Sequence, residues 1–166
     1  MARDIAGLGS EIPSIVATST GLPCFVWQEK RGTPPNFVYD LIYAYIDVQG
    51  NIHKTTLFGN ATRLLWPALA ITPDNQIYVA FVEISSSVGK ITCLRFNYNN
   101  PQYSVYCEFT GCNFPKRIRM VVDNSNYPHL AWDEYWACYY NSTPKEVRRI
   151  YYGRFIGSAT IKEEVA

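Results

Sequence analysis

Three stretches of the chain repeat one pattern of apolar and polar positions. Each starts with apolar residues at alternate positions, passes a polar turn, and continues into a second apolar run that closes on aromatic-x-Glu. They are PSIVATSTGLPCFVWQE (13–29), PALAITPDNQIYVAFVE (67–83) and IRMVVDNSNYPHLAWDE (118–134), spaced by 54 and then 51 residues. Alternation with a period of two predicts strands. The turns are rich in Gly, Pro, Asn and Asp, which supply tight-turn dihedrals, so each stretch is predicted to form a β-hairpin.

Two further strand patterns follow each hairpin, and no segment shows a convincing helical pattern. Third strands are predicted at 39–47, 89–97 and 148–156, and fourth strands at 51–58, 103–109 and 158–165. The chain is therefore predicted to be all-β, with three four-stranded antiparallel units in a single domain spanning residues 1–166. The units lie at about 13–59, 67–110 and 117–165. A repeated four-stranded unit of about 50 residues is typical of β-propeller blades.

The repeat resembles the sialidase-like family of propeller repeats. In that family the hairpin ends on Trp, which Trp27 and Trp132 match and Phe81 replaces, and the third strand reads roughly Ile-Tyr-Tyr-x-Arg, which residues 150–154 match. The family's turn motif, Ser-x-Asp-x-Gly-x-Thr-Trp, is absent from the sequence. The resemblance covers 13–165 and implies a propeller fold.

The resemblance also implies a possible glycan-processing activity, which would need several arginines around a central channel. Arg119 lies on the innermost predicted strand of its unit and is the arginine placed to point toward such a channel. Arg63, Arg95 and Arg154 complete a conceivable set, although none of them lies on an innermost strand.

Three blades are too few to close a propeller, which needs about four to eight. Two sheet faces would stay open, bearing residues such as Phe25, Trp27, Leu130 or Trp132, depending on the direction of the alternation. Apolar surface on that scale marks an association site. We expect a homodimer of six blades with two-fold symmetry, in which blade 3 of one chain packs against blade 1 of the other. Three chains forming nine blades, or a chain cut from a longer propeller, are the alternatives.

Glu29, Glu83 and Glu134 share one position of the repeat. They could form a ring of ligand-binding carboxylates, or they could have a structural role such as accepting hydrogen bonds from a neighbouring blade. Repetition favours the structural role, because an active site usually breaks symmetry. Asp133 is particular to the third unit. Adjacent strand residues point to opposite faces, so Asp133 and Glu134 cannot act together on one glycosidic bond.

The aromatic members of the candidate ligand site lie in a predicted loop at 135–147, the longest between second and third strands. They are Tyr135, Trp136, Tyr139 and Tyr140. Aromatic rings stack on sugars or on partner side chains. The polar candidates are Asp133, Glu134 and Arg119, whose side chains could bond sugar hydroxyls. The alternative is that the rings pack on a neighbouring blade or on the second chain.

Composition and charge narrow the classes of partner. The net charge of +1 gives no reason to expect a nucleic-acid partner. No apolar run reaches the roughly 18 residues of a membrane helix, and the first residues lack a signal core, so an intracellular location is expected. Five Cys with no CxxC pair, and only two His, predict neither a disulfide framework nor a metal site.

We therefore expect a non-catalytic binding protein on a dimeric propeller, with a glycan or a protein as ligand. A sialidase-like hydrolase and a purely structural protein that binds only itself are the alternatives. No catalytic residue and no cofactor are assigned.

Overall fold

The computed structural model of the chain describes residues 10–33, 35–61, 64–85, 88–140, 143–156 and 159–165. Twelve β-strands and no helix occur in these residues. The strands form three antiparallel sheets of four, each made of consecutive strands. The predicted all-β class and its three four-stranded units are confirmed. The described residues contain no helix of the length and apolarity needed to cross a membrane.

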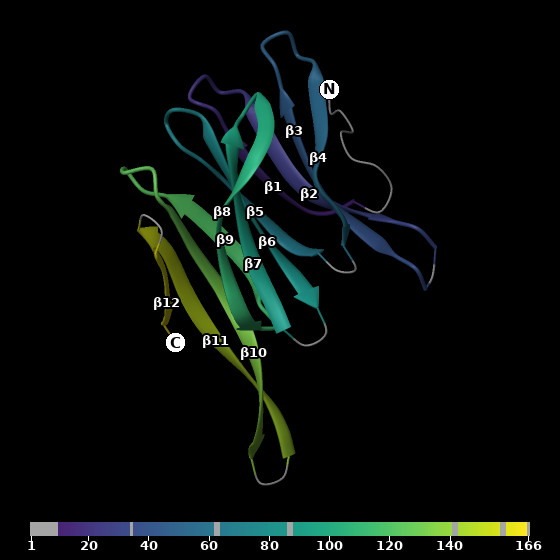
Figure 1. The fold of residues 1–166 in the computed structure, drawn as a ribbon, viewed down its shortest axis with the longest axis vertical. Helices are drawn as coiled ribbons and strands as arrows, with labels where there is room; N and C mark the ends of the chain where they lie inside the picture. Colours follow the sequence, from purple (N-terminus) through teal and green to yellow (C-terminus); the bar gives the residue numbers. More distant parts are fainter. Residues whose placement is uncertain are drawn as a thin grey trace.

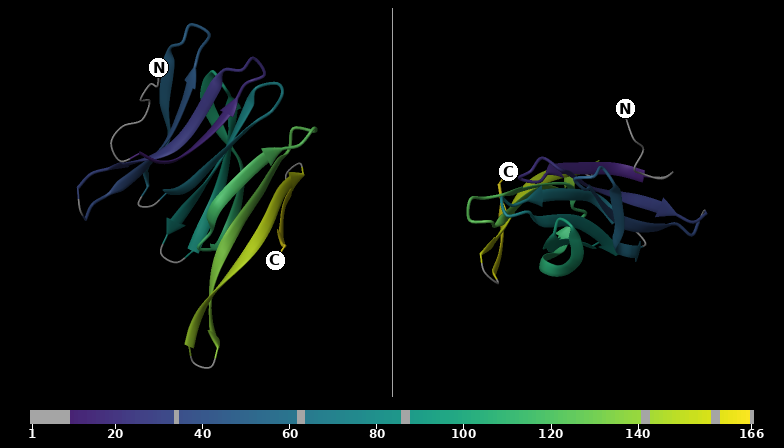
Figure 2. Two further views of the ribbon diagram at one scale, coloured as in Figure 1. Left: turned by 180° about the vertical axis from the view of Figure 1, so that it is seen from behind. Right: turned by 90° about the horizontal axis from the view of Figure 1, so that it is seen from above.

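The three sheets, called blades 1 to 3, lie side by side with blade 2 in the middle (Figures 1 and 2). Blade 1 consists of β1 (Ser10–Ala17), β2 (Pro23–Arg31), β3 (Val38–Ile46) and β4 (Ile52–Ala61). Blade 2 consists of β5 (Leu64–Ile71), β6 (Gln76–Ser85), β7 (Val88–Asn97) and β8 (Asn100–Asn113). Blade 3 consists of β9 (Lys116–Val122), β10 (Pro128–Tyr140), β11 (Thr143–Ile156) and β12 (Ala159–Glu164).

The predicted loop at 135–147 was wrong. β10 and β11 continue through it as a long hairpin whose pairing runs from Trp136 with Val147 to Tyr140 with Thr143, and this hairpin projects beyond the other blades at the bottom of Figure 1. Tyr, Trp and Val favour extended backbone, and the strand preference of this segment decides its structure.

The hairpin turns of the three blades share one construction. A side-chain oxygen of Thr18, Thr72 or Asp123 accepts a hydrogen bond from the backbone N–H four residues later, at 2.8–2.9 Å. The residue at the left-handed position is Gly21 (φ 83°), Asn75 (φ 64°) or Asn126 (φ 65°), and Gly and Asn tolerate positive φ better than other residues. Local turn chemistry therefore produces the repeat that the sequence displays.

The first strands of the blades meet along one line, where β5 packs against β1 on one side and β9 on the other. The fourth strands, β4, β8 and β12, form the opposite edges of the sheets. This is the arrangement of consecutive propeller blades, with the first strands innermost. Each first strand also carries an irregularity in its pairing with the second strand, which is a β-bulge.

Two hydrophobic cores fill the spaces between blades. The core between blades 1 and 2 contains Val26, Tyr43 and Phe81. The core between blades 2 and 3 contains Val82 and Trp132. Phe81 and Val82 are adjacent on β6 and therefore face opposite sides of blade 2, so one strand contributes to both cores.

The outer blades each keep one face that no other described sheet covers, which we call the outward face. Phe25 and Trp27 lie on the outward face of blade 1, in a small cluster with Ile42 and Ala44. Leu130 and Trp132 instead pack against blade 2. Of the apolar residues expected on the open faces, only those of blade 1 are therefore found there, and the outward face of blade 3 carries a different set.

Candidate functional site

Glu134 is enclosed between blades 2 and 3 and has no exposed surface. Its carboxylate accepts hydrogen bonds from Trp132 Nε1 (2.9 Å), Lys162 Nζ (2.5 Å) and the backbone N–H of Asn113 on blade 2 (3.0 Å). The charge is thus compensated within the protein, and the side chain ties blade 3 to blade 2. A ligand bound at the surface would not contact it.

The other two acids of this repeat position bond within their own blades. Glu29 accepts hydrogen bonds from Trp27 Nε1 (3.0 Å) and Lys54 Nζ (2.6 Å), which is the Trp–Glu–Lys arrangement of blade 3. Glu83 pairs with Lys90 at 2.9 Å and accepts a hydrogen bond from Thr92 Oγ1 (3.3 Å). In all three blades the acid joins strands of the sheet.

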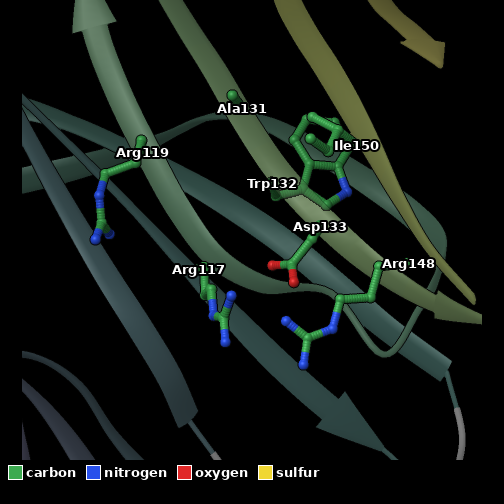
Figure 3. A pocket seen from close by; sticks show the side chains of 7 residues that line it. All are labelled: Arg117, Arg119, Ala131, Trp132, Asp133, Arg148 and Ile150. Atoms are coloured by element: carbon green, nitrogen blue, oxygen red, sulfur yellow. The ribbon is translucent and has the colours of Figure 1, made fainter. Parts of the chain in front are cut away.

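The outward face of blade 3 contains a hollow of about 380 Å³ (Figure 3). Its lining comes from three strands: Arg117, Arg119, Ala131, Trp132, Asp133, Arg148 and Ile150. Register explains most of this set. Ala131 pairs with Arg119, and Asp133 pairs with Ile150, and alternate residues of paired strands share one face of a sheet.

Arg117 reaches the hollow from the bulge of β9. The pairing moves from Ala131–Arg119 to Asp133–Lys116 across this bulge, and Arg117 has a φ of 53°. Trp66 at the equivalent position of β5 has a φ of 47°. The bulge therefore belongs to the scaffold, and such bulges redirect side chains. In blade 3 the residue at this bulge is a cation at the edge of a hollow.

The hollow combines three guanidinium groups with one carboxylate. Within the described residues no ion pair joins Arg117, Arg119 or Arg148 to an acid, and Asp133 Oδ1 is enclosed yet has no hydrogen-bond partner. In Figure 3 this carboxylate lies between the side chains of Arg117 and Arg148. An enclosed acceptor without a donor is costly, so Asp133 is suited to bond a hydroxyl or an amide supplied from outside.

Tyr135 lies beside the hollow and is covered by cations. Lys116 Nζ is 3.8 Å from the centre of its ring, and Arg148 Cζ is 4.8 Å from it. Such contacts are attractive because the ring face is negative. They hold the Arg148 guanidinium in place at the rim of the hollow.

A second hollow of about 200 Å³ shares Arg119 and Ala131 with the first and extends along β10 to His129 and Tyr152. His129 Nε2 lies 3.1 Å from Asp123 Oδ2, and its Nδ1 is hydrogen-bonded to the Tyr152 hydroxyl. The backbone N–H of Tyr127, followed by the His129 ring, lowers the pKa of Asp123 below its usual range. His129 is thus built into the turn of blade 3.

The structure brings some of the predicted site residues together and separates others. Arg119 and Asp133 line the hollow, and Tyr135 adjoins it. Glu134 points the other way. The side chains of Trp136, Tyr139 and Tyr140 lie outside the described residues.

The arginines that the sequence grouped do not share one hollow. Arg119 also borders a hollow of about 280 Å³ formed by the innermost strands β1, β5 and β9. Arg95 lines a separate hollow of about 330 Å³ between blades 2 and 3. Arg63 lies outside the described residues.

Sequence reasoning missed Arg117, Arg148 and Ile150. Ile150 had a visible signal, because the equivalent positions of the repeat are Leu41 and Ile91, both on faces that turn toward the next blade. Arg117 had one as well, because it lies two residues before Arg119 and alternation gives both side chains the same face.

No protein family model and no curated protein sequence matches the chain. The structure is similar to that of a fucose lectin from Kordia zhangzhouensis, solved in complex with methyl-fucoside. The TM-score is 0.53 and the identity 12%, over 91% of this chain and 96% of the lectin chain. At this identity the similarity concerns the fold, and the coverage means that the two chains have similar lengths. The resemblance to sialidase-like repeats stays a prediction.

Proposed function

We propose that the protein is a non-catalytic glycan-binding protein whose ligand occupies the hollow on the outward face of blade 3. The observation that supports this proposal most strongly is the composition of the hollow. Ala131 and Ile150 offer an apolar floor, while Asp133 and the arginines offer hydrogen-bonding groups around it. A sugar presents apolar C–H faces and hydroxyl groups together, and an apolar pocket with a few placed polar groups is the usual form of a small-ligand site. The similar fold of a fucose lectin supports this function.

Binding is favoured over hydrolysis by the number of acids. Most glycoside hydrolases use two carboxylates on either side of the scissile bond. Among the residues that line the hollow, Asp133 is the single acid, and Glu134 beside it is enclosed on the opposite face. The described lining therefore supports recognition of a glycan better than its cleavage by a pair of carboxylates. The sialidase-like alternative, which would use a tyrosine nucleophile, stays the second candidate.

We also propose that the protein self-associates with a second copy. This part rests on apolar repeat positions that are buried between blades elsewhere in the chain but exposed on the two outward faces. Leu41 and Ile91 are both 0% exposed because the next blade covers them, whereas the equivalent Ile150 is 48% exposed. At the other end, Leu69 is 4% exposed against blade 1, whereas the equivalent Ile15 is 62% exposed. Both outward faces thus retain apolar side chains at positions that another blade normally buries.

A second copy supplies the missing blades. In a two-fold ring of six blades, the outward face of blade 3 meets the outward face of blade 1 of the partner at both seams. This extends the existing junctions between blades 1 and 2 and between blades 2 and 3. The hollow would then lie at the seam between two chains. A protein that only assembled with itself would need the apolar positions but not the unpartnered carboxylate of Asp133.

The test of glycan binding is a glycan array followed by calorimetric titration of the strongest glycan that is retained. We expect Asp133→Ala to weaken binding about tenfold or more, because the variant loses a hydrogen bond to a charged group. Glu164→Ala serves as the matched control and should bind like the wild type, because Glu164 pairs on β12 with Tyr151, which faces blade 2. A wild type that retains no glycan, or an Asp133→Ala variant with unchanged affinity, would refute the function.

A further inference from the structure

We infer that the ligand of this hollow is an acidic saccharide, a sugar that bears a carboxylate or a sulfate. This inference rests on the proposed function and adds the chemical class of the ligand. Three guanidinium groups surround one carboxylate in the hollow, and Lys116 adds a fourth cation beside Tyr135. Arginine presents paired N–H donors that match the oxygens of carboxylate and sulfate groups.

The cations are not required by the scaffold. The position of Arg119 is Ser14 in blade 1 and Ala68 in blade 2, and the position of Arg148 is Tyr39 and Gly89. All these neutral residues belong to sheets that fold in the same way. The positive charge is therefore particular to the outward face of blade 3 and is not needed to form the sheet.

The neighbouring groups also keep these cations available. The described residues contain no ion pair to Arg117, Arg119 or Arg148. Arg119 Nη1 donates one hydrogen bond to the carbonyl of Ile118 (3.0 Å), and among the described residues no other acceptor binds its remaining N–H groups. Tyr135 contacts Arg148 through the face of its ring, and among the described residues no acid takes up the edge of this guanidinium.

Asp133 explains why the ligand is a saccharide with an acidic group and not a bare anion. A simple anion has no hydrogen to donate, so it would leave Asp133 Oδ1, which has no donor within the described residues, without a partner. A uronate or a sulfated sugar places hydroxyl groups beside its charge. The hydroxyls can donate to Asp133 while the charged group meets the arginines, so one ligand satisfies both signs of charge.

The experiment compares matched pairs of glycans on an array and by titration. Each uronate is printed beside its carboxyl-reduced parent, and each sulfated glycan beside its desulfated parent. We expect the acidic member of at least one pair to bind about tenfold or more tightly than its neutral parent. This preference should weaken as salt is raised from about 0.05 to about 0.5 M, because salt screens exposed charges.

Variants assign the preference to the hollow. Arg119→Gln and Arg148→Gln should each lower affinity for the acidic member about tenfold more than they lower affinity for its neutral parent, because the neutral parent has no charged group to meet the guanidinium. The matched control is Arg149→Gln, since Arg149 is adjacent to Arg148 on β11, faces the other side and pairs with Glu164. Thermal unfolding of each variant establishes that it is folded.

The possible outcomes separate the inference from the function on which it rests. If neutral parents bind as tightly as acidic members and Asp133→Ala weakens both, the inference of an acidic ligand is overturned while the proposed glycan binding stands. Acidic glycans bound with no effect of either arginine variant would overturn this assignment of the hollow. Equal retention of poly-glutamate would show that the protein recognises anions in general. A protein that retains no glycan would overturn both.

Discussion

In blades 2 and 3 the same repeat positions lie on the face that points away from blade 1. These positions are buried in blade 2 and border a solvent-exposed hollow in blade 3. Ala80, Val82 and Ile91 of blade 2 are buried under blade 3. The equivalent residues of blade 3 are Ala131, Asp133 and Ile150, which border a hollow open to solvent. One sheet geometry therefore serves either as a core face or as a binding surface, depending on whether another blade follows.

The faces that point toward the preceding blade behave differently. Trp132 has blade 2 in front of it and Trp27 has no described sheet, yet both bond to a Glu two residues later, which in turn bonds to a Lys. This arrangement is intrinsic to the blade, whereas the opposite face changes its residues with its surroundings. Candidate chemistry is therefore found on the face that varies.

The largest expected difference separates Ile91 from Ile150. Ile91→Ala should lower the free energy of unfolding by about 2–5 kcal/mol, because it leaves a cavity in the core between blades 2 and 3. Ile150→Ala should lower the free energy of unfolding by no more than about 0.5 kcal/mol at concentrations where the chain is monomeric, since the side chain of Ile150 is half exposed there. Urea unfolding with an unchanged m-value measures both.

Self-association makes the cost of Ile150→Ala depend on protein concentration. If two copies close the ring, Ile150→Ala should become more destabilising as protein concentration rises, while Ile91→Ala should not gain in the same way. Equal costs of the two substitutions in dilute solution would show that the outward face of blade 3 is already covered within one chain, and the comparison between the blades would be wrong.

The two Trp–Glu–Lys arrangements differ in what lies beyond them, and Glu134→Ala compared with Glu29→Ala measures the difference. Glu134→Ala should cost about 2–4 kcal/mol, because it leaves the half-buried Asn113 N–H and the buried Trp132 indole without an acceptor. Glu29→Ala should cost about 1 kcal/mol, since Lys54 is well exposed and can be solvated. Unfolding by urea, followed by tryptophan fluorescence, gives both values. Equal losses would mean that the contact from Glu134 to blade 2 contributes little.

The sequence predicted the hairpins well because their causes are local. Turn chemistry at Thr18, Thr72 and Asp123 and the alternation on either side leave a pattern that recurs along the chain. The four strands of each blade and the position of Arg119 on an innermost strand follow from the same repeat. The hairpin extension at 135–147 was missed because its departure from the repeat was read as a loop, although its aromatic residues favour strands.

The hollow could not be predicted in the same way, because it depends on contacts between distant segments. Arg117 enters it through a bulge in β9, and Arg148 comes from another strand and is held by Tyr135. The bulge shifts the pairing by one residue, so that Lys116 pairs with Asp133, and alternation alone places Lys116 on the wrong face. The direction of Leu130 and Trp132 likewise became known only from the packing of blade 2.

Ring closure can be tested at the other end of the molecule with Ile15→Glu. A charge at this exposed position should leave the fold unchanged but weaken dimerisation by roughly two orders of magnitude, since a desolvated carboxylate would replace apolar surface at the seam. Sedimentation equilibrium should give the mass of two chains for the wild type and one for the variant. Val48→Glu is the control, because Val48 is exposed in the turn after β3, away from the sheet face. A wild type that stays monomeric at high micromolar concentration would refute the closure.

The smallest expected effect concerns pH and compares two Asp–His turns, one beside the outward face of blade 3 and one at the end of blade 1. In the latter, the His53 ring and the N–H groups of Asn51 and Gln49 lower the pKa of Asp47 to about 2. A carboxyl whose pKa is depressed by folding stabilises the protein above its unfolded value, near 3.9, and this contribution is lost as pH falls from about 4 toward about 2. Asp47→Asn should therefore flatten the fall of the melting temperature across this range.

Asp123→Asn makes the comparison specific to the outward face. The pKa of Asp123 is lowered in the same direction by Tyr127 N–H and His129, so the sign of its effect is the same. Because His129 and Tyr152 border the second hollow, a ligand or a second copy bound there should change the acid response of the wild type and of Asp47→Asn. The same binding should change the acid response of Asp123→Asn much less. Melting curves from pH 5 to pH 2, with and without the glycan that binds most tightly, measure this difference. An equal change in all three proteins would show that the turn of blade 3 is not coupled to the surface that the hollow occupies.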